Sequence, residues 1–304
     1  MDIHNICEPL NYTINQQGKN IRKDLILYIQ SLLGNTNVYI DQIIKDIDIT
    51  HNATLIIDDI HDQSLKRRGK TCAYLLFGKP LTLNAGYLKT LQILNELDKF
   101  YPVSAIDTIR KLYIDSFYKG HIGQGFDIYW REIKHIPSLE EYIIMVDNKT
   151  GIIFTTSVKI CDLCNNKQAP KIQLDKITIL MTYIGRFFQI RDDYINLTCP
   201  KYWKLKGFCE DLDNGNVNYV LVILKHIYPT YALPKSKKKI YKILYKKRIL
   251  EAVWYILDQY KEKIILLEKK ITHSNKTTYH LDKFFKKLTF EKPLHYTKIL
   301  NQPL

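Results

Sequence analysis

The sequence predicts an all-α protein, and three observations lead to this prediction. Only 12 glycines and 10 prolines occur in 304 residues, so long stretches lack the residues that break helices. Apolar residues recur at i, i+3 and i+4 through most of the chain. The sequence has no alternating pattern long enough for a useful strand. We therefore expect one large helical bundle, with helices of roughly 15 to 25 residues joined by short loops.

Three apolar stripes place principal helices in chain order. Their members are Ile40, Ile43, Ile44 and Ile47; then Ile177, Leu180, Met181, Ile184, Phe187 and Phe188; then Leu257, Tyr260, Ile264, Leu267 and Ile271. Helices should be interrupted at Gly34-Asn35, Gly78 to Pro80, Tyr101-Pro102, Pro137-Ser138, Cys199-Pro200 and Pro229 to Pro234. Glu141 follows Ser138 by three residues, which predicts a capping box at a helix start.

The chain contains no Gly/Ser linker and no sharp change in composition, so we expect a single domain over residues 1–304. Its first residues lack the basic start and apolar run of a signal peptide, and no stretch of about 18 residues is free of charge. Both observations favour a cytoplasmic protein. Six dispersed cysteines do not form a disulfide framework, and the pair Cys161 and Cys164 has no matching second pair for zinc. We expect thiols packed between helices.

The formal net charge of +14 suits nucleic acid, an acidic membrane face or small anionic substrates. The densest basic run, Lys235 to Arg248, holds eight basic residues and no acidic one. Tyr241 and Tyr245 sit in it at helical spacing, not as the interleaved stacking residues of a nucleic-acid reader. We therefore expect a solvated lysine-rich helix face and no nucleic-acid partner, with a weak contact to a membrane surface left open.

Two separated aspartate clusters follow apolar helical sequence. Each has polar oxygen ligands at i, i+1 and i+4, which brings them within about one helical turn: Asp58, Asp59 and Asp62, then Asp192, Asp193 and Asn196. Buried carboxylates without cations are costly. Oxygen ligands without His or Cys favour a hard ion such as Mg²⁺, which commonly bridges protein carboxylate to substrate phosphate. Two facing clusters predict a site for a metal-bound diphosphate.

Basic residues follow at defined places. Arg67-Arg68-Gly69 comes about a turn and a half after the first cluster, and guanidinium groups bind phosphate through paired hydrogen bonds. Lys19 and Arg22 are three residues apart, which puts them on one helix face.

Several segments carry a resemblance to the eukaryotic geranylgeranyl diphosphate synthases, a group of trans-prenyl diphosphate synthases. They are His51 to Asp62 with Arg67 to Gly69, Gly123 to Arg131, Lys149 to Gly151, and Phe188 to Leu197 with Phe208 to Leu212. The similarity runs from about Gly18 to Asp213. It implies the isoprenoid synthase fold, which is a single large helical bundle around a central metal-lined cavity, in a homodimer or higher homo-oligomer.

The resemblance also implies an activity and a set of site residues. The activity is head-to-tail condensation of isopentenyl diphosphate with allylic diphosphates of C5 to C15 to give geranylgeranyl diphosphate. Three Mg²⁺ ions per active site would be held by Asp58, Asp59, Asp62, Asp192 and Asp193, with Asn196 in support. The allylic diphosphate would contact Arg67, Lys149 and Lys206, and the developing carbocation Thr150 and Gln189. Isopentenyl diphosphate would be bound by Lys19, Arg22, His51 and Arg68.

Product length should depend on the side chains four and five residues before Asp58, because one helical turn of 5.4 Å is about the length of an isoprene unit. Thr54 and Ala53 stand there, and both are small, which disfavours a farnesyl product. Three other positions form the pocket floor in the family. Lys89 and Thr90 stand where the family has two aromatic residues, and the third floor residue, His121, is present. We expect a C20 product, with C25 or longer and C15 left open.

Three rival interpretations are less favoured. A terpene cyclase shares the fold, but its second metal motif carries Ser or Thr and Glu at intervals that Asp192 to Asn196 lacks. A non-catalytic synthase subunit would be expected to lose an aspartate cluster, and both are complete. A basic helical protein that binds nucleic acid rests on charge alone.

Overall fold

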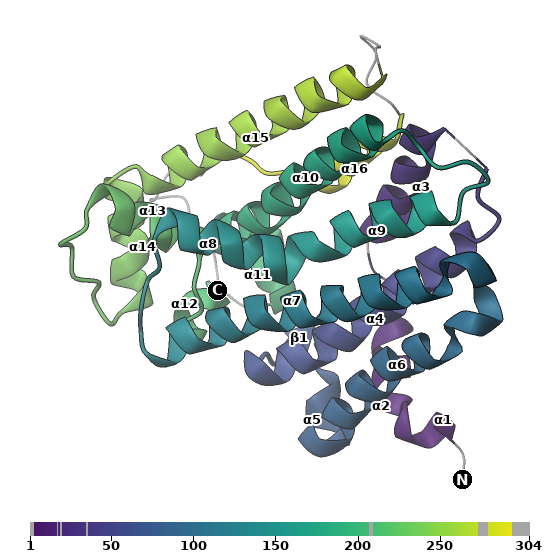
Figure 1. The fold of residues 1–304 in the computed structure, drawn as a ribbon. Coiled ribbons are helices and arrows are strands. Elements are labelled where there is room, and N and C mark those ends of the chain that lie inside the picture. The colour runs from purple at the N-terminus through teal and green to yellow at the C-terminus, as the bar shows by residue number, and fades with distance from the viewer. Residues whose placement is uncertain are drawn as a thin grey trace.

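A computed structural model describes residues 3–16, 18, 20–34, 36–206, 209–272 and 279–293, with residues 204–206 and 279–280 described by their backbone only. The chain folds into an all-α array of long helices, which confirms the predicted fold class (Figure 1). Within the described ranges, the single sheet is a hairpin of two-residue strands, β1 (Lys66–Arg67) and β2 (Lys70–Thr71).

Most helices of the N-terminal part of the chain lie in the lower part of Figure 1, and the helix Ile21–Leu33 lies at the upper right. The helices of this part are α1 (Ile3–Ile6), α2 (Glu8–Ile14), α3 (Ile21–Leu33), α4 (Ile40–His61), α5 (Ala73–Phe77), α6 (Lys79–Phe100), the 3₁₀ turn η1 (Val103–Ala105) and α7 (Ile106–Glu132).

The remainder adds α8 (Leu139–Val146), the π-helical segment η2 (Asp147–Gly151), α9 (Ile152–Leu163), α10 (Lys171–Thr198), α11 (Pro200–Lys206), α12 (Glu210–Asn214), α13 (Tyr219–Ile227), α14 (Lys237–Lys246), α15 (Ile249–Thr272) and α16 (Tyr279–Lys287). Among the described residues, no helix is both long and apolar enough to cross a bilayer.

The predicted apolar stripes and helix interruptions are confirmed, whereas the expected helix length of roughly 15 to 25 residues fits α4, α6 and α15 but not shorter helices such as α8 and α13. The three apolar stripes lie in α4, α10 and α15, and the described interruption residues fall at or beside helix ends. Asn35 lies outside the described residues. At the start of α8, the backbone N–H of Glu141 donates to Ser138 Oγ at 3.2 Å, and Glu141 Oε2 accepts from the backbone N–H of Ser138 at 2.8 Å. The capping box is therefore present, and it fixes where the chain enters α8.

The cysteines also behave as expected. All six are free thiols, and Cys161 and Cys164 are buried in and just after α9. Burial raises the pKa of the Cys164 thiol to about 12, so it packs as a small neutral group.

Two glycines allow the central helices to approach closely. A Cβ at Gly123 on α7 would lie 2.4 Å from the backbone nitrogen of Lys149, and a Cβ at Gly185 on α10 would lie 2.9 Å from Gly151 Cα. No other residue type fits in such space. The two glycines therefore let η2 lie directly between α7 and α10, where its Lys149 and Thr150 side chains reach groups on both helices.

The hairpin separates two adjacent arginines. Arg68 and Gly69 form its two-residue turn, with φ of 54° and 81°, as a tight turn of this kind requires. The turn reverses the chain just after Arg67, which leaves Arg67 buried against α4 while the Arg68 side chain reaches the end of α2.

Candidate functional site

The first aspartate cluster lies at the C-terminal end of α4, and its three carboxylates face different surroundings. Asp58 keeps 23% of its side chain exposed and accepts a hydrogen bond from Gln124 Nε2 on α7 at 3.0 Å. Asp62 is the C-cap of α4, keeps 17% exposed, and accepts from Arg131 Nη1 at 2.8 Å. Asp58 and Asp62 thus reach the open side of the cluster.

Asp59 points the other way. Its side chain is 2% exposed, and its Oδ1 accepts from Arg67 Nε at 2.8 Å and from Arg67 Nη2. Arg67 is itself nearly buried and lies 3.7 Å from Asp58 Oδ2. The ion pair between Asp59 and Arg67 therefore holds the hairpin against α4 and keeps a positive charge next to Asp58.

Lys149, in the π-helical segment, lies among acidic groups. Its Nζ is 2.5 Å from Asp127 Oδ2 on α7 and 3.7 Å from Asp58 Oδ1. Burial opposes its charge, but Asp127 and Asp58 raise the pKa of Lys149 above its ordinary value. The ammonium group is therefore held charged at the edge of the first cluster, and π-helical turns are frequent at such functional positions.

Thr150 connects this segment to the second cluster on α10. Thr150 Oγ donates to Gln189 Oε1 at 2.8 Å, and Gln189 Nε2 donates to Asp193 Oδ1 at 2.9 Å. Asp193 is 4% exposed, and its Oδ2 also accepts from the Tyr142 hydroxyl at 2.6 Å and from the backbone N–H of Tyr219 at 2.7 Å. The Asp193 carboxylate thus accepts from one donor on its own helix and from two donors on α8 and α13.

Asp192 remains the accessible carboxylate of the second cluster. Its side chain is 31% exposed and pairs with Arg191 Nη1 at 2.8 Å. Asn196, at the end of the motif, is 2% exposed. The second cluster therefore has one accessible residue, Asp192, and two buried ones, whereas two residues of the first cluster reach accessible space.

A separate group of basic side chains lies where α2, α3 and α4 meet. Arg68 donates to the backbone oxygens of Thr13 and Gln16 and to Asn52 Oδ1, each at 3.1 Å. Burial lowers the pKa of Arg22 to about 10, although Asp48 and Asp192 act to raise it. Among the described residues, the buried Nε of Arg22 has no hydrogen-bond partner.

His51 completes this group. Burial, and then the charges of Arg22, Arg68 and Arg67, lower the pKa of His51 well below its ordinary value, so the ring is neutral at pH 7. Clustered guanidinium groups, an unpartnered buried donor and a neutral imidazole form a site that an anion would stabilise.

Two predicted anion ligands cannot be placed. Lys19 lies outside the described residues, and Lys206 ends α11 with its side chain outside them. A Cβ at Gly18 would lie 3.4 Å from Arg68 Cζ, so the chain next to Lys19 does reach the basic group.

The five chain-length candidates lie on three helices, α4, α6 and α7. Ala53 is fully buried against Gly86 of α6, whereas Thr54 is exposed. Thr90 Oγ donates to the backbone oxygen of Gly86 at 3.0 Å, and the exposed His121 lies on α7 with Nδ1 3.0 Å from Phe117 O. Thr54 is therefore the candidate on α4 whose side chain reaches accessible space.

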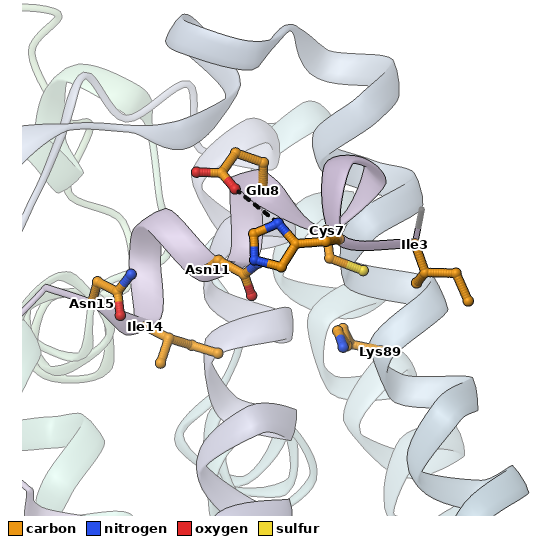
Figure 2. A pocket seen from close by; sticks show the side chains of 8 residues that line it. Ile3, Cys7, Glu8, Asn11, Ile14, Asn15 and Lys89 are labelled. Atoms are coloured by element: carbon orange, nitrogen blue, oxygen red, sulfur yellow. Dashed lines mark ion pairs between the residues drawn. The ribbon is translucent and has the colours of Figure 1, made fainter. Parts of the chain in front are cut away.

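Lys89 faces another part of the molecule. It lies at a cavity of about 530 Å³ that α1 and α2 form with α6, together with residues such as Cys7, Asn11 and Ile14 (Figure 2). This cavity is lined by none of the aspartates of the two clusters.

The acidic residues fit a hard metal ion. Within the described ranges, no three His, Cys, Asp or Glu side chains are already gathered to hold one. Burial, and then repulsion from Asp58, raise the pKa of Asp62 to about 7, as expected where a second negative charge lies close to another without a cation. Asp58, Asp62 and Asp192 supply partly exposed oxygen ligands of the kind Mg²⁺ prefers.

We expect Mg²⁺ with inorganic diphosphate to raise the melting temperature more at about pH 8 than at about pH 6. Since the pKa of Asp62 is higher in the folded protein, Asp62 contributes stability at low pH that is lost as pH rises from its ordinary 3.8 through about 7. Metal binding requires the deprotonated carboxylate, so a bound cation offsets the stability that is lost when Asp62 gives up its proton. Thermal denaturation with Mg²⁺ and diphosphate, or with EDTA, at both pH values measures the rise in melting temperature. In Asp62→Asn, this rise should be nearly the same at the two pH values. Equal stabilisation of the unmodified protein at both pH values would contradict the prediction.

Several site residues received no role from the sequence. Gln124, Asp127 and Arg131 lie at i, i+3 and i+7 of α7, so they share one helix face toward the first cluster. That spacing is a signal that could have identified them. Helical spacing could not have identified Tyr142 and Asn218. They reach Asp193 because α8 and the start of α13 pack on α10.

Comparisons with known proteins agree with this geometry. A sequence model described as polyprenyl synthetase matches residues 3–253. The geranylgeranyl pyrophosphate synthase of Eremothecium gossypii is 32% identical over 218 residues, which is 71% of this chain and 68% of that protein. Quiannulatene synthase of Emericella variicolor is 36% identical over 218 residues, and sesterfisherol synthase of Neosartorya fischeri 34% over 215. In both cases the match covers 71% of this chain but only 28% and 27% of the larger relative.

Proposed function

This chain belongs to the polyprenyl synthetase family, and from that premise we propose that it condenses isopentenyl diphosphate with allylic diphosphates of C5 to C15 to make geranylgeranyl diphosphate. One observation carries the proposal. Two accessible acidic groups flank Lys149 and Thr150, and a second, separate basic group contains Arg22, His51 and Arg68. A condensation of two diphosphates needs two anion sites, of which one must also hold metal.

Mg²⁺ would be held by Asp58, Asp62 and Asp192, with three ions as the proposed number, and when bound it neutralises the diphosphate that leaves the allylic substrate. We assign Asp59 and Asp193 a positioning role, because both are buried and hydrogen bonded to protein donors. Lys149 lies 3.7 Å from Asp58 and closer to Asp127, and its ammonium group would act on a diphosphate oxygen once a cation shares the negative charge of Asp58.

The chain's own residues then organise the reaction. The allylic C–O bond breaks and leaves a carbocation, the alkene of isopentenyl diphosphate forms the new C–C bond, and the departing diphosphate accepts the proton lost from the adjacent carbon. Thr150 Oγ and Gln189 Oε1 supply oxygen dipoles between the two clusters, where a cation would be stabilised. Arg22 and Arg68 hold the second diphosphate in place, which brings the two substrates together.

The test is elongation with purified protein, Mg²⁺, isopentenyl diphosphate and each of the C5, C10 and C15 allylic diphosphates, followed by mass spectrometry of the products. We expect C20 as the end product. No elongation with any primer would contradict the proposed activity and favour a non-catalytic subunit. A C15 end product or a ladder of C25 and longer would keep the chemistry but contradict the assigned product.

Thr54→Phe should shift the end product from C20 toward C15, because the exposed Thr54 lies one turn before Asp58 and a phenyl ring would fill about one isoprene length. Product analysis by mass spectrometry measures the shift. Thr108→Phe is the matched control, since Thr108 is exposed near the start of α7 and should leave the product unchanged. An unaltered product from Thr54→Phe would mean that the chain does not grow along this face of α4.

We propose that residues 1–304 act as one domain in a homodimer. A buried cluster that extends from Ile21 to Leu288 supports the single domain. Exposed apolar side chains one turn apart on each of two consecutive helices support the dimer: Tyr87 and Leu91 on α6, and Ile114 and Tyr118 on α7. Exposed contiguous apolar side chains commonly mark an interface. Light scattering should give twice the mass of the chain, and Leu91→Glu with Ile114→Glu should give a single chain; an unmodified monomer would contradict the proposal.

A further inference from the structure

The basic run forms a stripe of lysines on one face of α14. Lys238, Lys239, Lys242 and Lys246 are exposed at intervals of one to four residues on a single face of the helix, and the exposed Lys235 lies just before it and completes the stripe. The opposite face is apolar and buried through Ile240, Tyr241 and Leu244. The helix is thus anchored to the core on one side and presents ammonium groups on the other (Figure 1 shows α14 with α12 and α13 at one end of the molecule).

These five lysines have no acidic partner within the described part of the chain. Three other basic residues of the run have partners: Lys237 pairs with Asp213, Arg248 with Glu251, and Lys247 lies 3.6 Å from the centre of the Tyr228 ring. The five lysines of the stripe make no ion pair with any described residue, and residues 235 to 248 include no acidic side chain. Their charge is directed to solvent.

An apolar loop borders the stripe. A groove of about 470 Å³ is lined on one side by the segment Tyr231 to Pro234 and on the other by Lys239, Lys242, Ile243 and Lys246. Ile227, at the end of α13 before this loop, keeps 48% of its surface exposed. Ammonium groups beside a shallow apolar groove match an interface in which phosphate headgroups lie next to acyl chains.

We propose that this face of α14 and the groove beside it dock onto an anionic membrane surface. The charge of the stripe complements acidic headgroups, and the apolar groove faces the same way as the lysines that line it. Nucleic acid is a poorer match, because Tyr231, the one ring among the described residues that line the groove, already has the ammonium group of Lys247 5.0 Å from its centre. No residue assigned to the reaction lies on α14, so this proposal stands apart from the proposed activity.

The test is co-sedimentation of the full chain with vesicles of phosphatidylcholine alone or with about 30% phosphatidylserine, at low and high salt. We expect binding only to the anionic vesicles and loss of binding at high salt. A variant with Lys238, Lys239, Lys242 and Lys246 changed to Gln should bind several hundredfold more weakly, since each lysine near an anionic surface contributes about fivefold. The same four positions changed to Arg should retain binding.

A charge-matched control separates the stripe from net charge. Lys111, Lys159, Lys171 and Lys176 are exposed on α7, α9 and α10, and changing them to Gln removes the same four charges elsewhere. The affinity of this control variant for anionic vesicles should fall less than tenfold, and circular dichroism should show that both Gln variants are folded. Equal loss in both variants, or no binding of the unmodified protein to anionic vesicles, would overturn the proposal. Binding to RNA or DNA through the same lysines without vesicle binding would overturn it in favour of nucleic acid.

Discussion

Asp58→Asn should reduce kcat/KM for elongation by at least about a thousandfold while leaving the protein folded, because it removes a metal-binding charge without removing an acceptor. The asparagine Oδ1 can still accept from Gln124 Nε2, which now bonds Asp58 at 3.0 Å. Lys149 keeps its closer contact with Asp127, so its charge remains compensated. Steady-state kinetics and thermal denaturation of the purified variant measure the two effects.

Asp115→Asn is the matched control for Asp58→Asn. Asp115 also lies on a long helix and pairs with a lysine, Lys119 at 2.8 Å, but 47% of its side chain is exposed and it lies on α7 outside both clusters. The control should retain nearly full activity, since an exposed pair of this kind contributes little. If Asp58→Asn elongated substrate at a rate close to the control, the metal site would be misassigned.

Adjacent carboxylates of the second cluster should give opposite results. Asp193→Ala should destabilise the fold by about 3 to 5 kcal/mol, because it leaves buried donors of Tyr142, Tyr219 and Gln189 without an acceptor. Asp192→Ala removes a partly exposed group with one ion-pair partner, Arg191, and should abolish turnover with little loss of stability. Thermal denaturation should separate them by roughly 5 to 15 °C.

Tyr142→Phe tests the same assignment from the donor side. It deletes one of the hydrogen bonds to Asp193 and should cost about 1 kcal/mol, well below the effect of Asp193→Ala. Magnesium titrations of elongation complete the comparison. An Asp193→Ala protein with unchanged melting temperature and a greatly raised Mg²⁺ requirement would make Asp193 a metal ligand and not a positioning residue.

Much of the site follows from local sequence. The spacing i, i+1, i+4 places Asp58 and Asp62 on one end of α4, because an α-helix turns by 100° per residue whatever surrounds it. The same rule predicts that Gln124, Asp127 and Arg131 share a face of α7. The apolar stripes located α4, α10 and α15 for the same reason, since a buried helix must repeat its apolar residues with the helical period.

The roles of neighbours within a motif did not follow from the sequence. Asp58 and Asp59 are the same residue type, but Asp59 contacts Arg67 because the hairpin folds back on α4 at that point. Arg67 and Arg68 are equivalent in type, and they diverge because the positive φ of Arg68 and Gly69 turns the chain between them. Such differences depend on which neighbouring element covers which face.

The sequence by itself determined that the chain is helical and that two carboxylate clusters and several basic groups stand at helix-compatible spacing, because helical periodicity is a local property. Only the tertiary structure decided which of these groups remain accessible. Tyr142 reaches Asp193 across 51 residues and Tyr219 across 26, and Lys149 approaches Asp58 because Gly123 leaves no side chain in the way. Accessibility is set by packing between distant segments, and that packing is not encoded in the spacing of any single motif.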